Sequence, residues 1–447
     1  MTDLQKLFIQ RECSSEIFFK KEQKSFREIL GRATDCTLHS KKSEWIVMID
    51  ENNPANLMTG ILSCIHHNQN FIIACQEDIS HEELEAYPKI YLSNISEHTF
   101  RKKSEVHKEK QEKTGFKFND VFFGFLTSGS SGKSKIIIHP ISNLMTNALH
   151  VNNLLEVKRG TIFQLALPTY HIAGLAILFR AFFNGSPLNH LHKKDLETEN
   201  LKGVISLVSA QIPILLKNKN ISPKELILFI GGGKINLSHL SACINARFPT
   251  FTSYGMSETA STFSIKKQTT DKLNSSIGKP IANGEFSIIN QILYIKTPVL
   301  FAGELINGEI VKASLSNNFY RTNDRAKIEG DEIYLLGRED EIIVSGGKNI
   351  SLKRISEMIE SRFSELDYQL ITHPHQKWGE SYSIFIMSDG TINHLETANE
   401  LKSNLKNEYS PFTIHFLTGE EEYKGIKPSK QELLDLLAED LKKVING

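Results

Sequence analysis

The sequence is poor in the residues that stabilise secreted or metal-dependent folds. Its 447 residues include five cysteines, with no CxxC pair and no cysteine placed with histidines at the spacing of a zinc site. Scattered cysteines in a chain of this length argue against a disulfide scaffold and favour a reduced compartment. We therefore expect a cytoplasmic protein without a structural metal.

An excess of charge and long apolar runs are missing as well. Lysine plus arginine number 52, as do aspartate plus glutamate, so the formal net charge is zero, and nothing indicates a nucleic-acid or anionic-membrane partner. The longest apolar run, IAGLAILFRAFF, is about half a bilayer span and contains Arg180, which predicts a buried helix. The N-terminal MTDLQKLFIQRE has no signal-peptide core. We expect no membrane insertion.

The patterning of the chain predicts an α/β protein with more than one domain. From Trp45 onward, short apolar runs alternate with amphipathic stretches, which is typical of parallel strands covered by helices. Short strands separated by turns follow over residues 278–337, and the pattern then becomes α+β. We expect an N-terminal domain over residues 1–339 and a C-terminal domain over residues 340–447. The charged residues 101–115 indicate a solvated linker or surface loop, with a basic docking patch as the alternative.

The stretch FGFLTSGSSGKSKIIIHP, residues 123–140, has the composition of a phosphate-binding loop. It is not a Walker P-loop, because Thr127 stands at the required glycine and the following KIIIHP is typical of a strand, whereas a P-loop opens a helix. We expect a loop between two strands that covers a polyphosphate, or else a simple polar hairpin turn. The candidate phosphate contacts are Thr127, Ser128, Gly129, Ser130, Ser131, Gly132, Lys133 and Lys135.

This stretch resembles the TSG-rich loop of the adenylate-forming superfamily, which includes the AMP-binding acyl- and aryl-CoA ligases. Further matches follow in that family's order: GGGK (231–234), SYGMSETAS (253–261), YRTNDRAKIEGDEIYLLGREDEIIVSGGKNI (320–350) and GIKPSKQEL (425–433). The resemblance implies a large domain of parallel α/β sheets with a small barrel-like subdomain, and a small mobile α+β lid. LPTYHIAGLAILFRAFFNG, SGGKNI and GIKPSKQ look most like the o-succinylbenzoate–CoA ligases of menaquinone biosynthesis.

The resemblance also implies roles for individual residues. Lys427 would be the catalytic lysine of adenylation, Glu258 would hold Mg²⁺, and His171 would lie beside the acyl pocket or cap its helix. Asn323 replaces the family's usual glycine before the ribose-binding aspartate, and we expect it to keep a left-handed turn there. The implied nucleotide contacts beyond the phosphate loop are Gly231, Gly232, Gly233, Ser253, Tyr254, Gly255, Met256, Ser257, Asp324 and Arg338.

The C-terminal domain carries the remaining implied roles. Asp340 would be the hinge of the lid, and the coenzyme A channel would be lined by Ser345, Gly346 and Gly347. A capping-box pattern at Ser429 and Glu432 predicts that the last helix starts just after Lys427. The lysine would then lie on a short loop that can reach the large domain.

The implied reaction joins a carboxylic acid to coenzyme A through an acyl-adenylate, with ATP and Mg²⁺ as cofactors and coenzyme A as co-substrate. The expected partners are these small molecules, and a homo-oligomer is possible. Three alternatives stay open: an adenylating enzyme for another acid or a carrier-protein thiol, a non-catalytic nucleotide-binding homologue, and a P-loop kinase or ATPase. Nothing in the sequence identifies the residues of the acid pocket.

Overall fold

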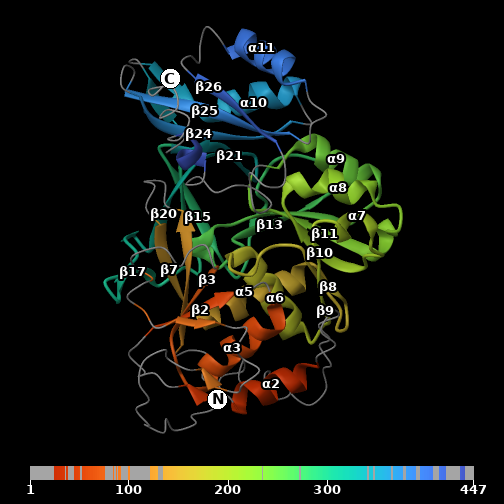
Figure 1. The fold of residues 1–447 in the computed structure, drawn as a ribbon, viewed down its shortest axis with the longest axis vertical. Coiled ribbons are helices and arrows are strands. Elements are labelled where there is room, and N and C mark those ends of the chain that lie inside the picture. Colours follow the sequence, from red (N-terminus) through yellow and green to blue (C-terminus); the bar gives the residue numbers. More distant parts are fainter. Residues whose placement is uncertain are drawn as a thin grey trace.

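The computed structural model describes residues 25–35, 37–38, 45–50, 53–75, 84, 87, 89–91, 99–100, 121–128, 134–233, 235–270, 273–339, 342–345, 348–363, 366–375, 379–388, 393–405, 412–418 and 433–437. Within these residues the strands form two seven-stranded sheets, two five-stranded sheets and a two-stranded ladder of β1 (Thr37–Leu38) with β5 (Thr99–Phe100). Figure 1 shows the sheets and their helices stacked along the long axis of the molecule.

The first seven-stranded sheet contains the strands that flank the predicted phosphate segment. Its order is β18 (Glu309–Lys312), β17 (Gly303–Ile306), β7 (Ser134–Pro140), β6 (Phe122–Ser128), β3 (Phe71–Cys75), β2 (Ile46–Asp50) and β4 (Lys89–Tyr91). Strands β4, β2, β3 and β6 are parallel, whereas β7 runs antiparallel to β6. The segment therefore joins two strands, as predicted, and does not open a helix.

The second seven-stranded sheet places the glycine-rich segment and the SYGMSETAS motif beside each other. Its order is β14 (Lys279–Pro280), β13 (Ser264–Gln268), β12 (Thr250–Tyr254), β11 (Leu226–Ile230), β10 (Gly203–Leu207), β8 (Phe163–Leu165) and β9 (Leu188–His190). The five strands from β9 to β12 are parallel, so β11 and β12 end at the same edge. Ligands of α/β proteins bind at this carboxyl edge.

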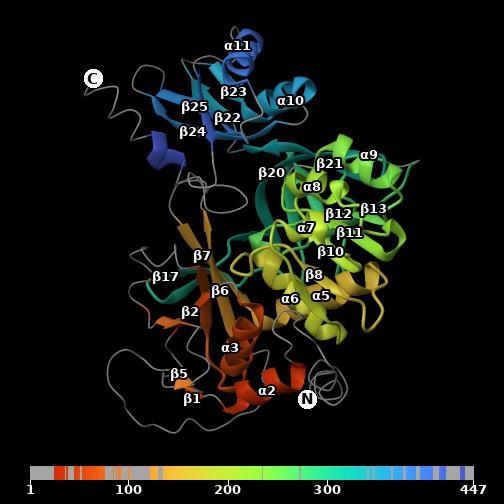
Figure 2. The ribbon, with the colours of Figure 1, turned by 45° about the vertical axis from the view of Figure 1, so that its right-hand side comes forward.

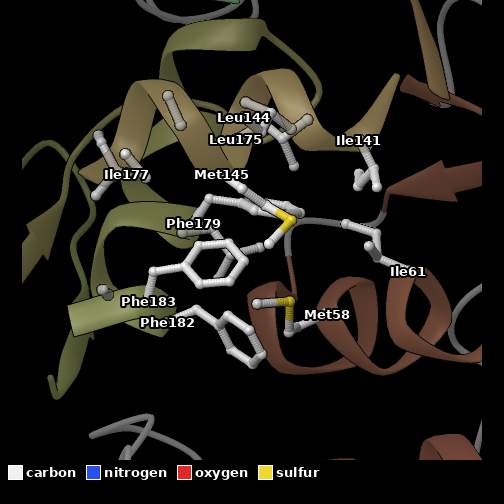
Figure 3. Close-up of a cluster of buried hydrophobic side chains, with 14 of the residues drawn as sticks. Met58, Ile61, Ile141, Leu144, Met145, Leu175, Ile177, Phe179, Phe182 and Phe183 are labelled. Atoms are coloured by element: carbon white, nitrogen blue, oxygen red, sulfur yellow. The ribbon is translucent and has the colours of Figure 1, made fainter. Parts of the chain in front are cut away.

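Helices cover both faces of this second sheet. One face carries α7 (Asp195–Thr198), α8 (Ile212–Lys217) and α9 (Leu237–Asn245), whose apolar residues form one cluster with the strands. On the other face, α5 (Ile141–Leu154) and α6 (Ile172–Asn184) share a core with both seven-stranded sheets and with α2 (Phe26–Asp35) and α3 (Pro54–His66). Figure 3 shows methionine, leucine, isoleucine and phenylalanine side chains from α3, α5 and α6 meeting in this core.

Local sequence explains where these helices begin and end. The Asn53 side chain accepts a hydrogen bond from the Asn56 amide at 2.9 Å and caps α3, and Pro54 occupies the first turn, where no amide donor is needed. Helix α6 ends at Gly185, whose φ of 61° suits a residue without a Cβ. Arg180 lies in the middle of α6 and is 2% exposed. The apolar run is thus a buried helix, as predicted.

A five-stranded antiparallel sheet follows where short strands were expected. It contains β15 (Glu285–Ile289), β16 (Ile292–Lys296), β20 (Phe319–Glu329), β19 (Leu315–Ser316) and β21 (Glu332–Arg338). Asn323 lies inside β20 and does not have a positive φ, so the expected left-handed turn is wrong. The reason is strand pairing: β21 holds β20 extended, with Asp324 opposite Arg338.

The C-terminal residues form an α+β unit at one end of the molecule (Figure 2). Its strands are β22 (Ile342–Ser345), β23 (Lys348–Ser351), β24 (Asp367–His375), β25 (Gly379–Ser388) and β26 (Phe412–Thr418), and its helices are α10 (Leu352–Arg362) and α11 (His394–Leu405). Helices α10 and α11 pack on one face, and the helical residues 433–437 pack on the other through Leu433 and Leu437. The domain division at residues 339/340 and the motion of a lid stay predictions. Among the described residues no helix is long and apolar enough to cross a membrane.

Candidate active site

Three of the predicted nucleotide contacts form a cluster beyond the end of β12. The Tyr254 hydroxyl donates a hydrogen bond to Asp324 Oδ2 at 2.5 Å, and Arg338 Nη1 lies 3.8 Å from Asp324 Oδ1. Burial, followed by the neighbouring Asp324 carboxylate, raises the pKa of Tyr254 well above its ordinary value. The phenol therefore stays a donor, and Asp324 keeps oxygen lone pairs that can accept hydrogen bonds from a ligand hydroxyl.

The predicted adenine wall follows β11. A Cβ on Gly231 would lie 2.3 Å from the Ser253 hydroxyl, and Gly232 has a φ of 76°, so internal structure explains both glycines. Gly233 is different, because no atom lies within 4 Å of a Cβ built there. Gly233 is exposed, and neither backbone strain nor a neighbouring atom requires glycine there, so its role beside the adenine stays a prediction.

Glu258 lies in a single 3₁₀ turn, Ser257–Thr259, just after the Tyr254-Gly255 pair. Its carboxylate accepts a hydrogen bond from the Tyr320 hydroxyl at 3.4 Å. Burial raises the pKa of Glu258, and Arg338 and Lys135 are close enough to lower it in part. A half-buried carboxylate of this kind is stabilised in its ionised form by a cation.

The surroundings of Glu258 fit Mg²⁺ that is held mainly by a nucleotide. Among the described residues no group of three or more His, Cys, Asp or Glu side chains could hold a metal by itself. Mg²⁺ is commonly bound by one or two carboxylates together with substrate phosphates and water. A single acidic side chain close to Lys135, a predicted phosphate contact, meets that requirement.

The turn around Glu258 is tightly folded. A Cβ on Gly255 would lie 1.7 Å from the Ser261 carbonyl oxygen, so no other residue fits without moving the backbone. The Met256 amide donates to the Thr259 hydroxyl at 3.1 Å, and the Ser253 hydroxyl donates to the Ile230 carbonyl at 3.4 Å. Ser253 and Met256 thus help to fold the site.

The phosphate segment is described at its two ends. Thr127 donates to the Lys135 carbonyl oxygen at 3.4 Å across the β6–β7 pair, and Lys135 Nζ contacts Glu304 at 2.7 Å. Both side chains of this ion pair are substantially exposed, so Lys135 can exchange Glu304 for a phosphate at low cost. Only the backbone of Ser128 is described, and Gly129, Ser130, Ser131, Gly132 and Lys133 lie outside the described residues.

His171 immediately precedes α6, where its carbonyl oxygen accepts the amide of Leu175 at 3.0 Å. Its side chain is exposed and makes no capping hydrogen bond, and its ring centroid lies 4.5 Å from that of Tyr170. The capping alternative therefore finds no support from a side-chain bond. A role beside the acyl pocket stays a prediction.

Arg180, on α6, contacts Phe229 of β11 and Thr262, the residue after the SYGMSETAS motif. Its Nη2 donates to the Thr262 hydroxyl at 3.1 Å, its guanidinium lies 4.9 Å from the centre of the Phe229 ring, and its Nε has no hydrogen-bond partner within the described part of the chain. Burial lowers the pKa of Arg180 to about 9, so it is still charged at neutral pH. An under-paired buried cation is a candidate for binding an anion.

The predicted residues of the C-terminal part are mostly not described. Ser345 ends β22, is 3% exposed, and its hydroxyl has no hydrogen-bond partner among the described residues. Asp340, Gly346, Gly347 and Lys427 lie outside the described residues. The predicted hinge, thiol channel and catalytic lysine therefore stay predictions.

Sequence reasoning missed two side chains that contact the Glu258 turn. Tyr320 begins the YRTND motif and reaches Glu258 from β20. His139 lies in the KIIIHP run, and its Nε2 lies 2.8 Å from the Ser257 carbonyl oxygen. Both positions were inside quoted motifs, but a phenol or an imidazole in a strand gives no local sign of a partner 62 or 118 residues away.

A cavity of about 470 Å³ adjoins this part of the site. Tyr320, Glu304, Phe301 and Arg321 are among its lining residues. Because Tyr320 also contacts Glu258, and Glu304 also pairs with Lys135, the cavity lies beside the predicted metal and phosphate region.

Comparison with known proteins adds a family to this geometry. Residues 45–308, more than half of the chain, match the AMP-binding enzyme family. The chain belongs to this family. Family membership agrees with the predicted nucleotide site and excludes the P-loop kinase or ATPase alternative.

Individual relatives agree with the family match. A 2-succinylbenzoate–CoA ligase from Haemophilus influenzae is 27% identical over 321 residues, which cover 70% of each chain. One from Staphylococcus aureus is 26% identical over 65% of this chain, and the match covers 62% of that protein.

Solved structures share the fold over nearly the full length. The structure of an Escherichia coli MenE variant with bound OSB-AMS matches with a TM-score of 0.77 at 19% identity and 97% coverage of both chains. The o-succinylbenzoate CoA synthetase of Bacillus subtilis, in complex with OSB-AMP, matches with a TM-score of 0.71 at 20% identity, over 92% of this chain and 94% of that one. The predicted adenylate-forming fold is therefore confirmed.

Proposed function

We propose that this AMP-binding enzyme is an ATP-dependent acid–CoA ligase, with 2-succinylbenzoate as its acid in menaquinone biosynthesis. The observation that carries the proposal is the convergence of Tyr254, Asp324 and Glu258 around Arg338, at the edge where β12 ends. This arrangement offers acceptors for ribose hydroxyls and a carboxylate for the cation of a nucleotide. The names of the curated relatives support the choice of acid and thiol.

The first step would join the acid to the α-phosphorus of ATP and release pyrophosphate. A carboxylate is ionised at neutral pH and needs no general base, so the main barrier is repulsion between two anions. Mg²⁺, when bound, would reduce this repulsion by neutralising phosphate charge. In this chain Glu258 would hold the cation, Lys135 and the phosphate segment would contact the phosphates, and Lys427 would supply a further positive charge.

The second step would transfer the acyl group from AMP to the thiol of coenzyme A. We propose that the C-terminal domain moves about Asp340, so that Lys427 leaves and Ser345, Gly346 and Gly347 line the path of the thiol. Such a motion controls access to the adenylate and does not accelerate the chemistry itself. A cytoplasmic location fits the reduced thiol that this step needs.

Arg180 favours a substrate with a second carboxylate. Its guanidinium contacts Phe229, two residues before the glycine segment, and Thr262, which follows the SYGMSETAS motif. Adenylation consumes one carboxylate of 2-succinylbenzoate, and the other needs a cation when it is buried with the substrate. We infer that Arg180 provides this charge, either directly or after a small shift of its side chain.

The test is ATP–pyrophosphate exchange with the full-length protein against 2-succinylbenzoate, benzoate and octanoate. Exchange with 2-succinylbenzoate alone supports the proposed acid, and exchange with another acid overturns it in favour of a different adenylating enzyme. Exchange with none of the acids, together with tight binding of ATP, points to a non-catalytic homologue. Adding coenzyme A or a carrier-protein thiol to the adenylate then identifies the acceptor.

A further inference from the structure

The turn that carries Glu258 has a backbone that its own sequence does not favour. Ala260 and Ser261 have φ values of 50° and 93°, although neither is glycine. A positive φ at two successive residues other than glycine is a strained backbone conformation, and such a conformation is kept only when the surrounding structure holds it in place. The question is which groups outside the turn supply that support.

Two side chains, His139 of β7 and Asn147 of α5, bind the turn, and Asn143 of α5 binds both His139 and a segment packed on the turn. His139 Nε2 lies 2.8 Å from the Ser257 carbonyl oxygen, and Asn147 Nδ2 donates to the carbonyl oxygens of Thr262 at 2.7 Å and Thr259 at 3.4 Å. Between them, Asn143 Nδ2 donates to the Leu300 carbonyl oxygen at 2.8 Å. Asn143 and Asn147 lie four residues apart and so on one face of α5, whereas His139 lies in β7 just before this helix.

The hydrogen bonds define the protonation of His139. Asn143 Nδ2 lies 3.0 Å from His139 Nδ1, and an amide nitrogen can only donate, so Nδ1 accepts and Nε2 carries the proton given to Ser257. The imidazole is fully buried and stacks with the rings of Phe123 and Phe125 at centroid distances of 5.6 and 6.1 Å. The ring is therefore held in one orientation.

Together these contacts fix three successive carbonyl groups. His139 binds the oxygen of Ser257, the Phe301 amide donates to the oxygen of Glu258 at 2.8 Å, and Asn147 binds the oxygen of Thr259. Phe301 is itself held in place, because Asn143 binds the carbonyl of the preceding residue. The peptide groups on both sides of the Glu258 side chain are thus clamped from outside the turn.

We propose that His139, Asn143 and Asn147 are positioning residues that hold the Glu258 carboxylate in place for the divalent cation of the nucleotide. They act through the main chain and do not touch the ligand. His139 is the residue before the last in β7, the strand that starts beside the phosphate segment, so this clamp also links Glu258 to the phosphate-binding hairpin. The inference rests on the proposed function only in giving Glu258 a cation to bind.

The test compares two buried asparagines that make the same kind of contact. Asn147→Leu removes bonds to two carbonyls in the Glu258 turn, and Asn218→Leu removes bonds to the carbonyls of Leu196 and Glu199, both at 2.9 Å, far from the site. We expect Asn147→Leu to weaken MgATP binding, measured by calorimetry without any acid, by about tenfold, the usual scale for losing a residue that orients a ligand-binding side chain. ATP binding in EDTA should change by less than about twofold in both variants. Equal weakening of MgATP binding in both variants would overturn the proposal.

Hydrogen exchange in the nucleotide-free protein gives a readout without ligand or activity. His139→Phe keeps a stacked ring but loses both hydrogen bonds, and it should speed exchange at residues 256–263 by about tenfold while other buried segments stay unchanged. His139→Gln places an amide near the lost Nε2 and should restore slow exchange. Uniformly faster exchange, or no rescue by Gln, would show a general packing role. Inactive wild-type protein would contradict the proposed function and leave this exchange result standing.

Discussion

Two regions of the molecule each contain a buried cationic side chain, and the two side chains differ in how many hydrogen-bond partners surround them. Among the described residues Arg180 and Lys266 are the lysine or arginine side chains classed as buried, at 2% and 8% exposure. Lys266 donates to Glu332, to Asn274 at 2.5 Å and to Ser276 at 2.9 Å, so all three ammonium hydrogens have acceptors. With the residues that the structure describes, the five N–H groups of Arg180 make one hydrogen bond, to Thr262.

This difference in hydrogen bonding indicates that the charge of Lys266 is structural, whereas the charge of Arg180 is available to a ligand. Lys266 and Glu332 join β13 to β21, and the fold supplies every partner that the ammonium needs. Burying Arg180 with so few partners is unfavourable, and stability gives no reason to keep it. Glu258 resembles Arg180 in this respect, because burial raises its pKa and its hydrogen-bond partner is a phenol. Removing the charge of Lys266 should therefore lower stability and spare activity, whereas removing the charge of Arg180 or Glu258 should lower activity and spare stability.

The largest effect is expected for Glu258→Gln. Loss of the negative charge should lower ATP–pyrophosphate exchange by about 10²- to 10³-fold, the scale for one transition-state interaction. Because the folded-state pKa of Glu258 is raised, its ionised form is destabilised at neutral pH, and the thermal unfolding midpoint should be unchanged or higher. A large fall in the midpoint together with the loss of exchange would place Glu258 among the structural charges.

Arg180→Met should also lower activity without lowering stability, and its loss of activity should be smaller than that of Glu258→Gln. We expect kcat/KM for 2-succinylbenzoate to fall by about 10²-fold, since one buried charge partner is removed, with no loss of thermal stability. An acid with one carboxylate should lose much less, so the ratio between the two acids is the useful measurement. Equal losses for both acids would remove the proposed contact with a second carboxylate.

Much of the fold was predictable from local patterns. The alternation of apolar and amphipathic runs after Trp45 corresponds to β2, α3 and β3, because buried parallel strands and an Asn-Pro helix start leave clear signals. The α+β pattern expected after residue 337 corresponds to the C-terminal unit that contains α10, Leu352–Arg362. The strand chemistry of KIIIHP correctly separated the hairpin from a P-loop.

The site was predictable as a set of motifs but not as a set of contacts. Tyr254 and Asp324 were both named, yet their hydrogen bond depends on sheets joined across 70 residues. The left-handed turn at Asn323 was wrong because cross-strand pairing overrode a local preference of asparagine. His139 and Asn147 were not recognised, because buried polar residues that bind main-chain carbonyls look like ordinary core positions in a sequence.

Lys266→Met should lower stability and leave activity almost unchanged, the reverse of what is expected for Arg180→Met. The substitution leaves Glu332 without its cation, and we expect a loss of about 2 kcal/mol in stability, less than for a fully buried pair because Glu332 is 34% exposed. Activity per folded molecule should stay within about twofold of wild type. Lys327→Met is the matched control, since the Lys327–Glu329 pair is exposed and its loss should cost under about 0.5 kcal/mol. A drop in activity without a drop in unfolding midpoint would break the distinction between Lys266 and Arg180.

The smallest effect is expected for substitution of Glu332, the acidic partner of Lys266. The Lys266 ammonium, with Tyr334 and Asn274, lowers the pKa of Glu332 from 4.5 to about 2. A depressed carboxylate pKa adds stability above the unfolded-state value, and this contribution is lost as the pH falls from about 4.5 towards 2. After allowing for solvent screening, Glu332→Gln should cost about 1 kcal/mol at neutral pH. Unfolding midpoints of wild type and variant, measured from about pH 6 down to about pH 3, should therefore approach each other on the acid side. Parallel curves would mean that the charge of the Glu332 carboxylate contributes nothing to stability. The contact between β13 and β21 would then be stabilised by the hydrogen bonds that glutamine can also make.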